Sequence, residues 1–131
     1  MELSGWFFED KEFVLNVDNH VGFVYLITNA TQDKFYVGKK LFMHRKAYQR
    51  NLKRKFKLVE SDWEDYIGSN EVLQEDAANG DILVREILYL CTSKGWMSYM
   101  ETLEILKRNA LQSDKYYNQW VSAKIHAKHL R

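Results

Sequence analysis

Apolar and polar positions alternate most clearly in two stretches of the N-terminal third of the chain, and this alternation predicts a β-hairpin. Residues 22–28 and 35–38 are rich in β-branched and aromatic side chains, and the polar residues 29–34 between them favour a turn. Since strand side chains point to alternate faces, Tyr25 and Tyr36 should share one face. The other face should carry apolar side chains of a core: Val24, Leu26, Phe35 and Val37.

The pattern on either side of this hairpin predicts more strands and several helices. Two short strand-like pieces are expected within 5–16, at the sheet edge, and the almost continuous apolar run 82–90 predicts a strand with both faces covered. Apolar residues recur at helical spacing after the hairpin and predict a helix over 41–56. Three further helices are expected, at 71–78, 95–109 and 119–129. Ser69 or Asn70 should cap the first, and Thr92 or Ser93 should begin the second. The fold class is therefore α+β, in the style of an α/β sandwich, with a small sheet flanked by helices in a single domain, 1–131.

The distribution of charged residues along the chain is more informative than the net charge. Nineteen basic and eighteen acidic residues leave a net charge of +1, which by itself suggests no partner. From Lys39 to Lys57, however, there are nine Lys or Arg and no Asp or Glu, and the acidic residues gather at 60–86. A segregated basic run is typical of a surface that binds a phosphate backbone, and a solvated helix face is the alternative.

Composition excludes several other classes. Cys91 is the single cysteine, so the chain has no disulfide framework and no cysteine metal site, and its apolar surroundings favour a core residue over a nucleophile. No N-terminal signal pattern is visible and no apolar stretch is long enough to span a bilayer. We expect no membrane partner and a reducing cytoplasm, that of a bacterial or phage-infected host cell.

The hairpin resembles that of the GIY-YIG nuclease superfamily. Phe23-Val24-Tyr25 stands where the family has its first triplet, with Phe23 in place of the glycine, and Tyr36-Val37-Gly38 stands where it has its second. The eleven positions between the two tyrosines suit that family, whereas Tyr66-Ile67-Gly68 lies too far from Tyr25 to complete the hairpin. The resemblance implies a central antiparallel three-stranded sheet with helices around it, and a small phage-type endonuclease.

The residues after the tyrosines offer the groups that phosphodiester hydrolysis needs. Tyr36 is the candidate general base, with a nearby cation to favour its phenolate, and Tyr25 would orient water or its partner tyrosine. Arg45 is the candidate phosphate clamp and His44 a candidate proton shuttle, with generic DNA contact as the alternative for both. Gly38 would let the backbone approach phosphate. Further phosphate contacts are expected from the basic run, at Lys39, Lys40, Lys46 and Arg50.

Two glutamates compete for the role of metal ligand. Glu104 has Lys107 and Arg108 at helical spacing, which suits a solvated structural pair, whereas Glu101 lies beside Met97 and Ile105 without a basic helical partner. A partly buried carboxylate of this kind calls for a cation from elsewhere, and one carboxylate can hold a Mg²⁺ ion that keeps most of its waters. The resemblance also points to Glu101, and it implies that Asn118 contributes to the site, where a turn-forming role is the alternative.

These observations predict a Mg²⁺- or Mn²⁺-dependent DNA endonuclease that cuts by direct water attack. The resemblance implies products with a 3′-hydroxyl and a 5′-phosphate. A non-catalytic DNA-binding module that keeps the fold is the alternative, and the set Tyr25, Tyr36, Arg45 and Glu101 favours the enzyme. With 131 residues we expect no separate targeting domain. Specificity is then expected to be low or to be supplied by a targeting partner, and the sequence leaves open whether the chain works as a homodimer.

Overall fold

A mixed five-stranded sheet forms the centre of the computed structural model, which describes residues 5–14, 20–51, 53–121 and 124–131. The strands run in the order β2 (Lys11–Glu12), β1 (Trp6–Phe8), β7 (Leu83–Cys91), β3 (Gly22–Asn29) and β4 (Lys34–Leu41). Strands β7, β3 and β4 are antiparallel, as expected, but β1 adds to β7 in parallel and β2 follows it. The expected three-stranded sheet is therefore the core of a larger one, because the two N-terminal pieces extend it.

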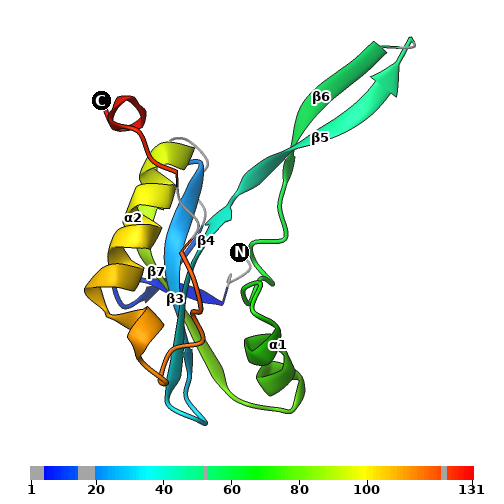
Figure 1. Ribbon diagram of the computed structural model, residues 1–131. Coiled ribbons are helices and arrows are strands. Elements are labelled where there is room, and N and C mark those ends of the chain that lie inside the picture. The colour runs from blue at the N-terminus through cyan, green and yellow to red at the C-terminus, as the bar shows by residue number, and fades with distance from the viewer. Residues whose placement is uncertain (1–4, 15–19, 52, 122–123) are drawn as a thin grey trace.

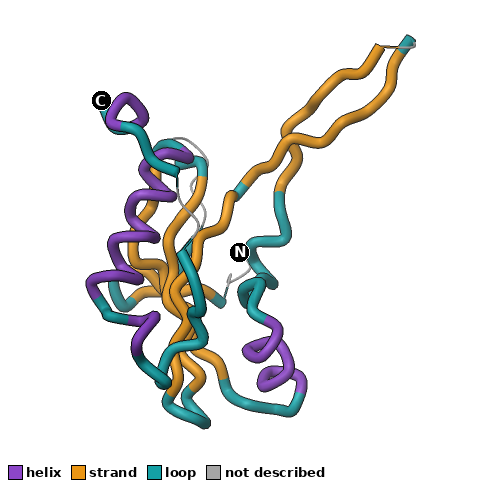
Figure 2. Tube along the Cα trace, in the orientation of Figure 1, coloured by secondary structure: helices purple, strands orange, loops and turns teal. Residues whose placement is uncertain are grey.

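Two helices cover the sheet, one on each side (Figures 1 and 2). Helix α1 (Glu71–Ala78) begins at Asn70, whose side chain accepts a hydrogen bond from the Leu73 N–H, and α2 (Lys94–Lys107) begins at Ser93 in the same way. Each cap is one of the two alternatives that the sequence offered for that helix. Short 3₁₀ turns follow at Ala110–Gln112 and Ala127–His129. None of the described helices is long and apolar enough to cross a membrane.

The alternation predicted for the hairpin is confirmed by its two cores. One face of the sheet buries an aromatic cluster that includes Trp6, Phe23, Tyr25, Phe42 and Trp63. The opposite face packs under α2 and includes Val24, Leu26, Val37, Cys91, Met97 and Ile105. Cys91 is a buried core residue, and burial raises the pKa of its thiol to about 11, as an inert cysteine requires.

The predicted helix over 41–56 is wrong. This stretch forms a second antiparallel hairpin, β5 (Met43–Arg50) and β6 (Lys53–Glu60), which extends away from the sheet (Figure 1). The helical spacing was misleading because Leu41 ends β4 and Phe42 is buried in the core, so neither belongs to the element that follows. Beyond them no continuous apolar stripe remains to be covered by a neighbour. The chain instead turns at Asn51, which has the left-handed conformation that asparagine tolerates.

The predicted C-terminal helix over 119–129 is also wrong, since only 127–129 are helical in the described part of that stretch. The backbone just before it is already bonded to the open edge of β4. The Phe35 N–H donates to the Lys115 carbonyl at 2.8 Å, and the Tyr117 N–H donates to the Phe35 carbonyl at 2.8 Å. This pairing holds the chain extended where a helix would have to begin.

Candidate active site

The two tyrosines of the motif lie on neighbouring strands and face the same side of the sheet. Tyr25 is opposite Gly38 in the β3–β4 ladder, Tyr36 is two residues away on β4, and the two rings are 6.2 Å apart. Tyr25 is only 1% exposed. A Cβ atom at Gly38 would overlap the Tyr25 hydroxyl. Position 38 therefore has a structural reason for glycine, which differs from the expected approach of phosphate to its backbone.

The triplet Tyr66-Ile67-Gly68 packs behind this tyrosine pair. The Tyr66 ring meets the Tyr25 ring edge-on at 6.1 Å, and the Lys40 ammonium lies 3.9 Å from the centre of the Tyr66 ring. Gly68 has a φ of +93°, and a Cβ atom there would come within 2.9 Å of the Tyr36 ring. The prediction that this triplet is not the second hairpin strand is confirmed, but sequence reasoning gave it no role.

Burial dominates the ionisation of both tyrosines. Burial raises the pKa of Tyr25 well above its ordinary value, and the neighbouring Tyr36, Tyr66 and Glu101 add to the rise. Burial also raises the pKa of Tyr36; its hydrogen bond with Ser69 opposes this, while Tyr66 and Glu101 add to it. Nearby cations were expected to lower the pKa of Tyr36 and so favour its phenolate. In this structure the effects that raise the pKa are larger. At neutral pH both side chains are phenols.

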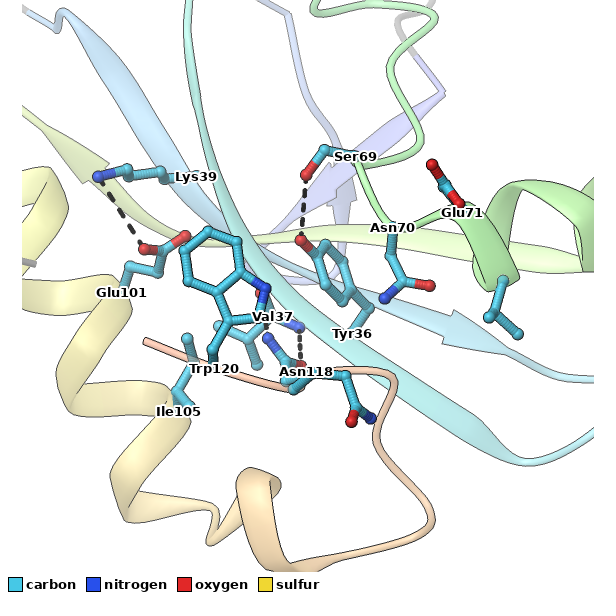
Figure 3. Close-up of a pocket in the computed structure, with 12 residues that line it drawn as sticks. Tyr36, Val37, Lys39, Ser69, Asn70, Glu71, Glu101, Ile105, Asn118 and Trp120 are labelled. Atoms are coloured by element: carbon cyan, nitrogen blue, oxygen red, sulfur yellow. Dashed lines mark hydrogen bonds and ion pairs between the residues drawn. The ribbon is translucent and has the colours of Figure 1, made fainter. Parts of the chain in front are cut away.

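A cavity of about 620 Å³ opens beside Tyr36, between β4 and α2 (Figure 3). Glu101 reaches it from α2 and Lys39 from β4, with 4.0 Å between the Lys39 Nζ and the Glu101 Oε1. The Lys39 ammonium also donates to the Ser98 hydroxyl at 2.8 Å. Tyr36 and Glu101 come from opposite faces of the sheet, and they share the cavity because β4 is the edge strand.

Glu101 has the environment that was predicted for it. Its side chain is 17% exposed, and burial raises the pKa of its carboxyl group, with the charge of Lys39 opposing that rise. The other carboxylate among the residues lining the cavity, Glu71, is exposed. Glu101 is thus a half-desolvated carboxylate that faces an open cavity and has one distant cation. A second cation bound at this carboxylate would compensate the cost of its partial burial.

Glu104 lies one turn away and is a structural residue. It is 3% exposed, accepts a hydrogen bond from the Tyr89 hydroxyl at 2.6 Å, and pairs with the Arg108 Nε at 2.8 Å. The predicted pairing with Arg108 is confirmed, but the pair is buried on the glutamate side rather than solvated. Glu104 does not line the cavity that holds Glu101.

Asn118 forms part of the cavity wall, and its amide group continues the β4 ladder. The Val37 N–H donates to the Asn118 Oδ1 at 3.0 Å, and the Asn118 Nδ2 donates to the Val37 carbonyl at 2.9 Å. The side chain is 5% exposed. Asn118 therefore closes the strand edge between the two residues that face the cavity, Tyr36 and Lys39.

The remaining predicted site residues lie on the β5–β6 hairpin and do not line this cavity. The Arg45 guanidinium lies over the Phe56 ring, 4.4 Å from its centre. Lys46 and Arg50 are exposed further along β5. His44, at the base of the hairpin, lines a smaller cavity of about 370 Å³, with Lys39 and Lys40 among its other lining residues.

Ser69 and Trp120 are among the lining residues of the main cavity to which the sequence assigned no role in the site. The Ser69 hydroxyl is 3.4 Å from the Tyr36 hydroxyl, and Trp120 stands at the cavity with 70% of its surface exposed (Figure 3). Ser69 directly follows the Tyr66-Ile67-Gly68 triplet, so the repeated motif was the available signal. Trp120 had no signal, because its position depends on the extended segment that pairs with β4.

The donor set for a metal ion is small. Among the described residues, no three His, Cys, Asp or Glu side chains cluster in a way that could hold an ion. A metal site here would depend on the single Glu101 carboxylate and on water. Such a site suits Mg²⁺, which binds through one or two carboxylates and keeps several waters.

The antiparallel β7–β3–β4 core and a tyrosine pair beside a carboxylate-lined cavity are the features expected of a GIY-YIG nuclease domain. Comparison with known families agrees, because residues 6–121 match the family described as "Putative endonuclease segE, GIY-YIG domain". The chain therefore belongs to this family of GIY-YIG endonucleases. Comparisons with curated proteins and with solved structures gave no match.

Proposed function

We propose that the chain is a DNA endonuclease that hydrolyses a phosphodiester bond in the cavity between β4 and α2, with Mg²⁺ or Mn²⁺ held at Glu101. The observation that carries this proposal is the convergence of Tyr36, Lys39 and Glu101 on one cavity from two elements. The cation would neutralise charge that develops on the phosphate. Family membership supports the nuclease class and DNA as its substrate.

Each side chain at the cavity has a role that follows from its contacts. Lys39 supplies the positive charge nearest to Glu101 and would hold a non-bridging phosphate oxygen. The Tyr36 hydroxyl, within reach of Ser69, would orient the attacking water. The Tyr25 ring packs against the Tyr36 ring and is itself backed by Tyr66, and Asn118 keeps β4 in place beside them.

Tyr36 can act as a base only after its hydroxyl has ionised, so its pKa has to fall from the raised value. The charge of the Glu101 carboxylate is one cause of that rise, so neutralising this charge moves the pKa in the required direction. Tyr36 therefore acts as a phenol that orients water in the resting protein, and its phenolate, the form that can accept a proton, becomes more populated when the charge at Glu101 is compensated.

Cleavage of supercoiled plasmid in Mg²⁺, in Mn²⁺ and in EDTA tests the proposal. We expect nicked or linear product in either metal and none in EDTA. The second candidate is the non-catalytic DNA-binding module, which the position of Arg45 away from the cavity favours. Binding of several DNA substrates without any product in either metal would establish that alternative.

A further inference from the structure

The β5–β6 hairpin has two chemically different faces. In an antiparallel pair, residues directly opposite each other share a face, and each strand alternates. One face, here called the basic face, carries no carboxylate; its members are His44, Lys46, Tyr48, Arg50, Lys53, Lys55, Lys57 and Val59. The other face carries Ala47, Phe56 and Leu58, with Arg45 over the Phe56 ring, and it includes Glu60.

The basic face leads directly into the active-site region. His44, its first residue, lines the 370 Å³ cavity at the base of the hairpin together with Lys39 and Lys40. Lys39 also lines the 620 Å³ cavity that holds Tyr36 and Glu101. A row of basic side chains therefore runs from the candidate active site, through the base of the hairpin, onto its basic face, although Lys40 is paired with Asp62 at 2.6 Å.

The base of the hairpin is fixed to the core. Phe42 and Trp63, on either side of it, are buried, and their ring centres are 5.1 Å apart. The Ser61 N–H donates to the Phe42 carbonyl at 2.8 Å, and the Phe42 N–H donates to the Val21 carbonyl at 3.0 Å. These contacts set the direction in which the hairpin leaves the sheet.

The dimensions of the hairpin suit one groove of DNA. Each strand has eight residues. At about 3.4 Å per residue, the hairpin reaches roughly 25 Å, which is less than one turn of B-DNA, about 34 Å. The major groove, about 12 Å wide, admits a two-stranded ribbon, whereas the minor groove is only about 6 Å wide.

We propose that the β5–β6 hairpin enters the major groove of duplex DNA with its basic face toward the duplex, within one helical turn of the bond to be cut. The location of the cut rests on the proposed function, but the groove contact does not require cleavage. Because the hairpin extends away from the sheet at one end of β4, the protected DNA should extend asymmetrically from the cut site.

Neighbouring residues on opposite faces provide a matched test. Lys55→Gln removes one charge from the basic face, and Arg54→Gln removes one from the other face, next to it in the chain. Binding is measured in the Glu101→Gln background, so that the DNA stays intact. Neutralising one phosphate-contacting lysine should reduce the slope of log affinity against log salt by about 1. We expect this reduction for Lys55→Gln and a clearly smaller one for Arg54→Gln.

Methylation interference identifies the groove. Methyl groups at guanine N7 lie in the major groove and those at adenine N3 in the minor groove. We expect interference at guanine N7 on one side of the cut site, lost in the triple variant of Lys46, Lys55 and Lys57 to Gln. Equal effects of Lys55→Gln and Arg54→Gln, interference at adenine N3 alone, or equally tight binding of single-stranded DNA or RNA would overturn the inference. Absence of cleavage by the unsubstituted protein would overturn the proposed function and leave this binding result intact.

Discussion

Glu101 and Glu104 lie one turn apart on α2 and occupy opposite environments. Burial raises the pKa of Glu101, so its ionised form is disfavoured by folding at neutral pH. A carboxyl whose pKa is raised in the folded state contributes stability below its ordinary value of 4.5, and this contribution is lost as the pH rises through the folded-state pKa. We therefore expect Glu101→Gln to melt at the same temperature as the unsubstituted protein at pH 7, or up to about 4 °C higher, while cleavage is lost and DNA binding is kept.

Glu104→Gln should behave in the opposite way. Burial alone would raise the pKa of Glu104, but the hydrogen bonds from Tyr89 and Arg108, together with the charges of Arg108 and Lys107, outweigh it and lower the pKa. Its stabilisation is present above pH 4.5 and is lost as the pH falls through the lowered folded-state pKa. Thermal melts at pH 7 should show a loss of about 2 kcal/mol for Glu104→Gln, and the difference should shrink at acidic pH. The cleavage rate of Glu104→Gln per folded molecule should equal that of the unsubstituted protein. Loss of cleavage in Glu104→Gln, together with normal cleavage by Glu101→Gln, would reverse the assignment of the metal ligand.

The ionisation of Tyr36 should report on Glu101 directly. The negative charge of Glu101 is one cause of the raised pKa of Tyr36. Glu101→Gln should therefore lower that pKa toward 10, and Glu104→Gln should leave it in place. Tyrosine-selective NMR titration, with Tyr36→Phe to assign the resonance, measures this shift. An unchanged pKa of Tyr36 in Glu101→Gln would show that the charge of Glu101 does not act on Tyr36. The proposed influence of Glu101 on the ionisation of Tyr36 would then be wrong.

Gly38 is a residue at which a single added methyl group should be damaging. Because an added Cβ atom would overlap the Tyr25 hydroxyl, Gly38→Ala has to displace a side chain that is 1% exposed. Overpacking of this kind costs about 1–3 kcal/mol. We expect a lower melting temperature and slower cleavage. Gly38→Ala should cost less stability in a Tyr25→Leu background, because leucine lacks both the hydroxyl and the ring carbon that the added Cβ atom would overlap. Equal destabilisation in both backgrounds would show that the Tyr25 side chain is not the obstacle.

At the level of elements, Asn118 shows how a loop residue completes a strand. Its amide makes the two hydrogen bonds that a further strand would make to Val37. Asn118→Ala leaves a buried N–H and C=O unpaired, at a cost of about 1–3 kcal/mol for each unsatisfied group. We expect faster hydrogen exchange of the Val37 amide and a lower melting temperature, with Gln119→Ala, which is exposed, as the control. Undiminished protection of the Val37 amide would mean that the strand edge is held by other contacts.

The strands of the sheet could be predicted because period-two alternation was imposed by two buried faces. Tyr25 and Val24 lie in different cores, as their alternation required. The β5–β6 hairpin could not be predicted in this way, since almost all of its described residues are exposed and no buried face imposes a period on them. The starts of the two helices were predictable to within one residue, with Ser69 or Asn70 and Thr92 or Ser93 as caps, because capping depends only on residues close together in the chain.

On the scale of the whole molecule, the candidate site was partly predictable. Tyr36, Lys39 and Glu101 were named from the sequence and meet in one cavity. Arg45 was placed near them by assuming a helix, and the hairpin carries it elsewhere. Ser69 and Trp120 were missed because they reach the cavity through the loop before α1 and through the segment that pairs with β4, neither of which has a periodic pattern.

The central claim is that one cavity, with Glu101 as its metal carboxylate, cuts DNA. The most direct measurement is the conversion of supercoiled plasmid by the unsubstituted protein, Glu101→Gln and Glu104→Gln in Mg²⁺ and in EDTA, with DNA affinity measured for each. The account predicts product only from the unsubstituted protein and Glu104→Gln, only in Mg²⁺, with DNA binding kept in all three. Cleavage by Glu101→Gln at the rate of the unsubstituted protein, or equal cleavage in EDTA, would contradict it.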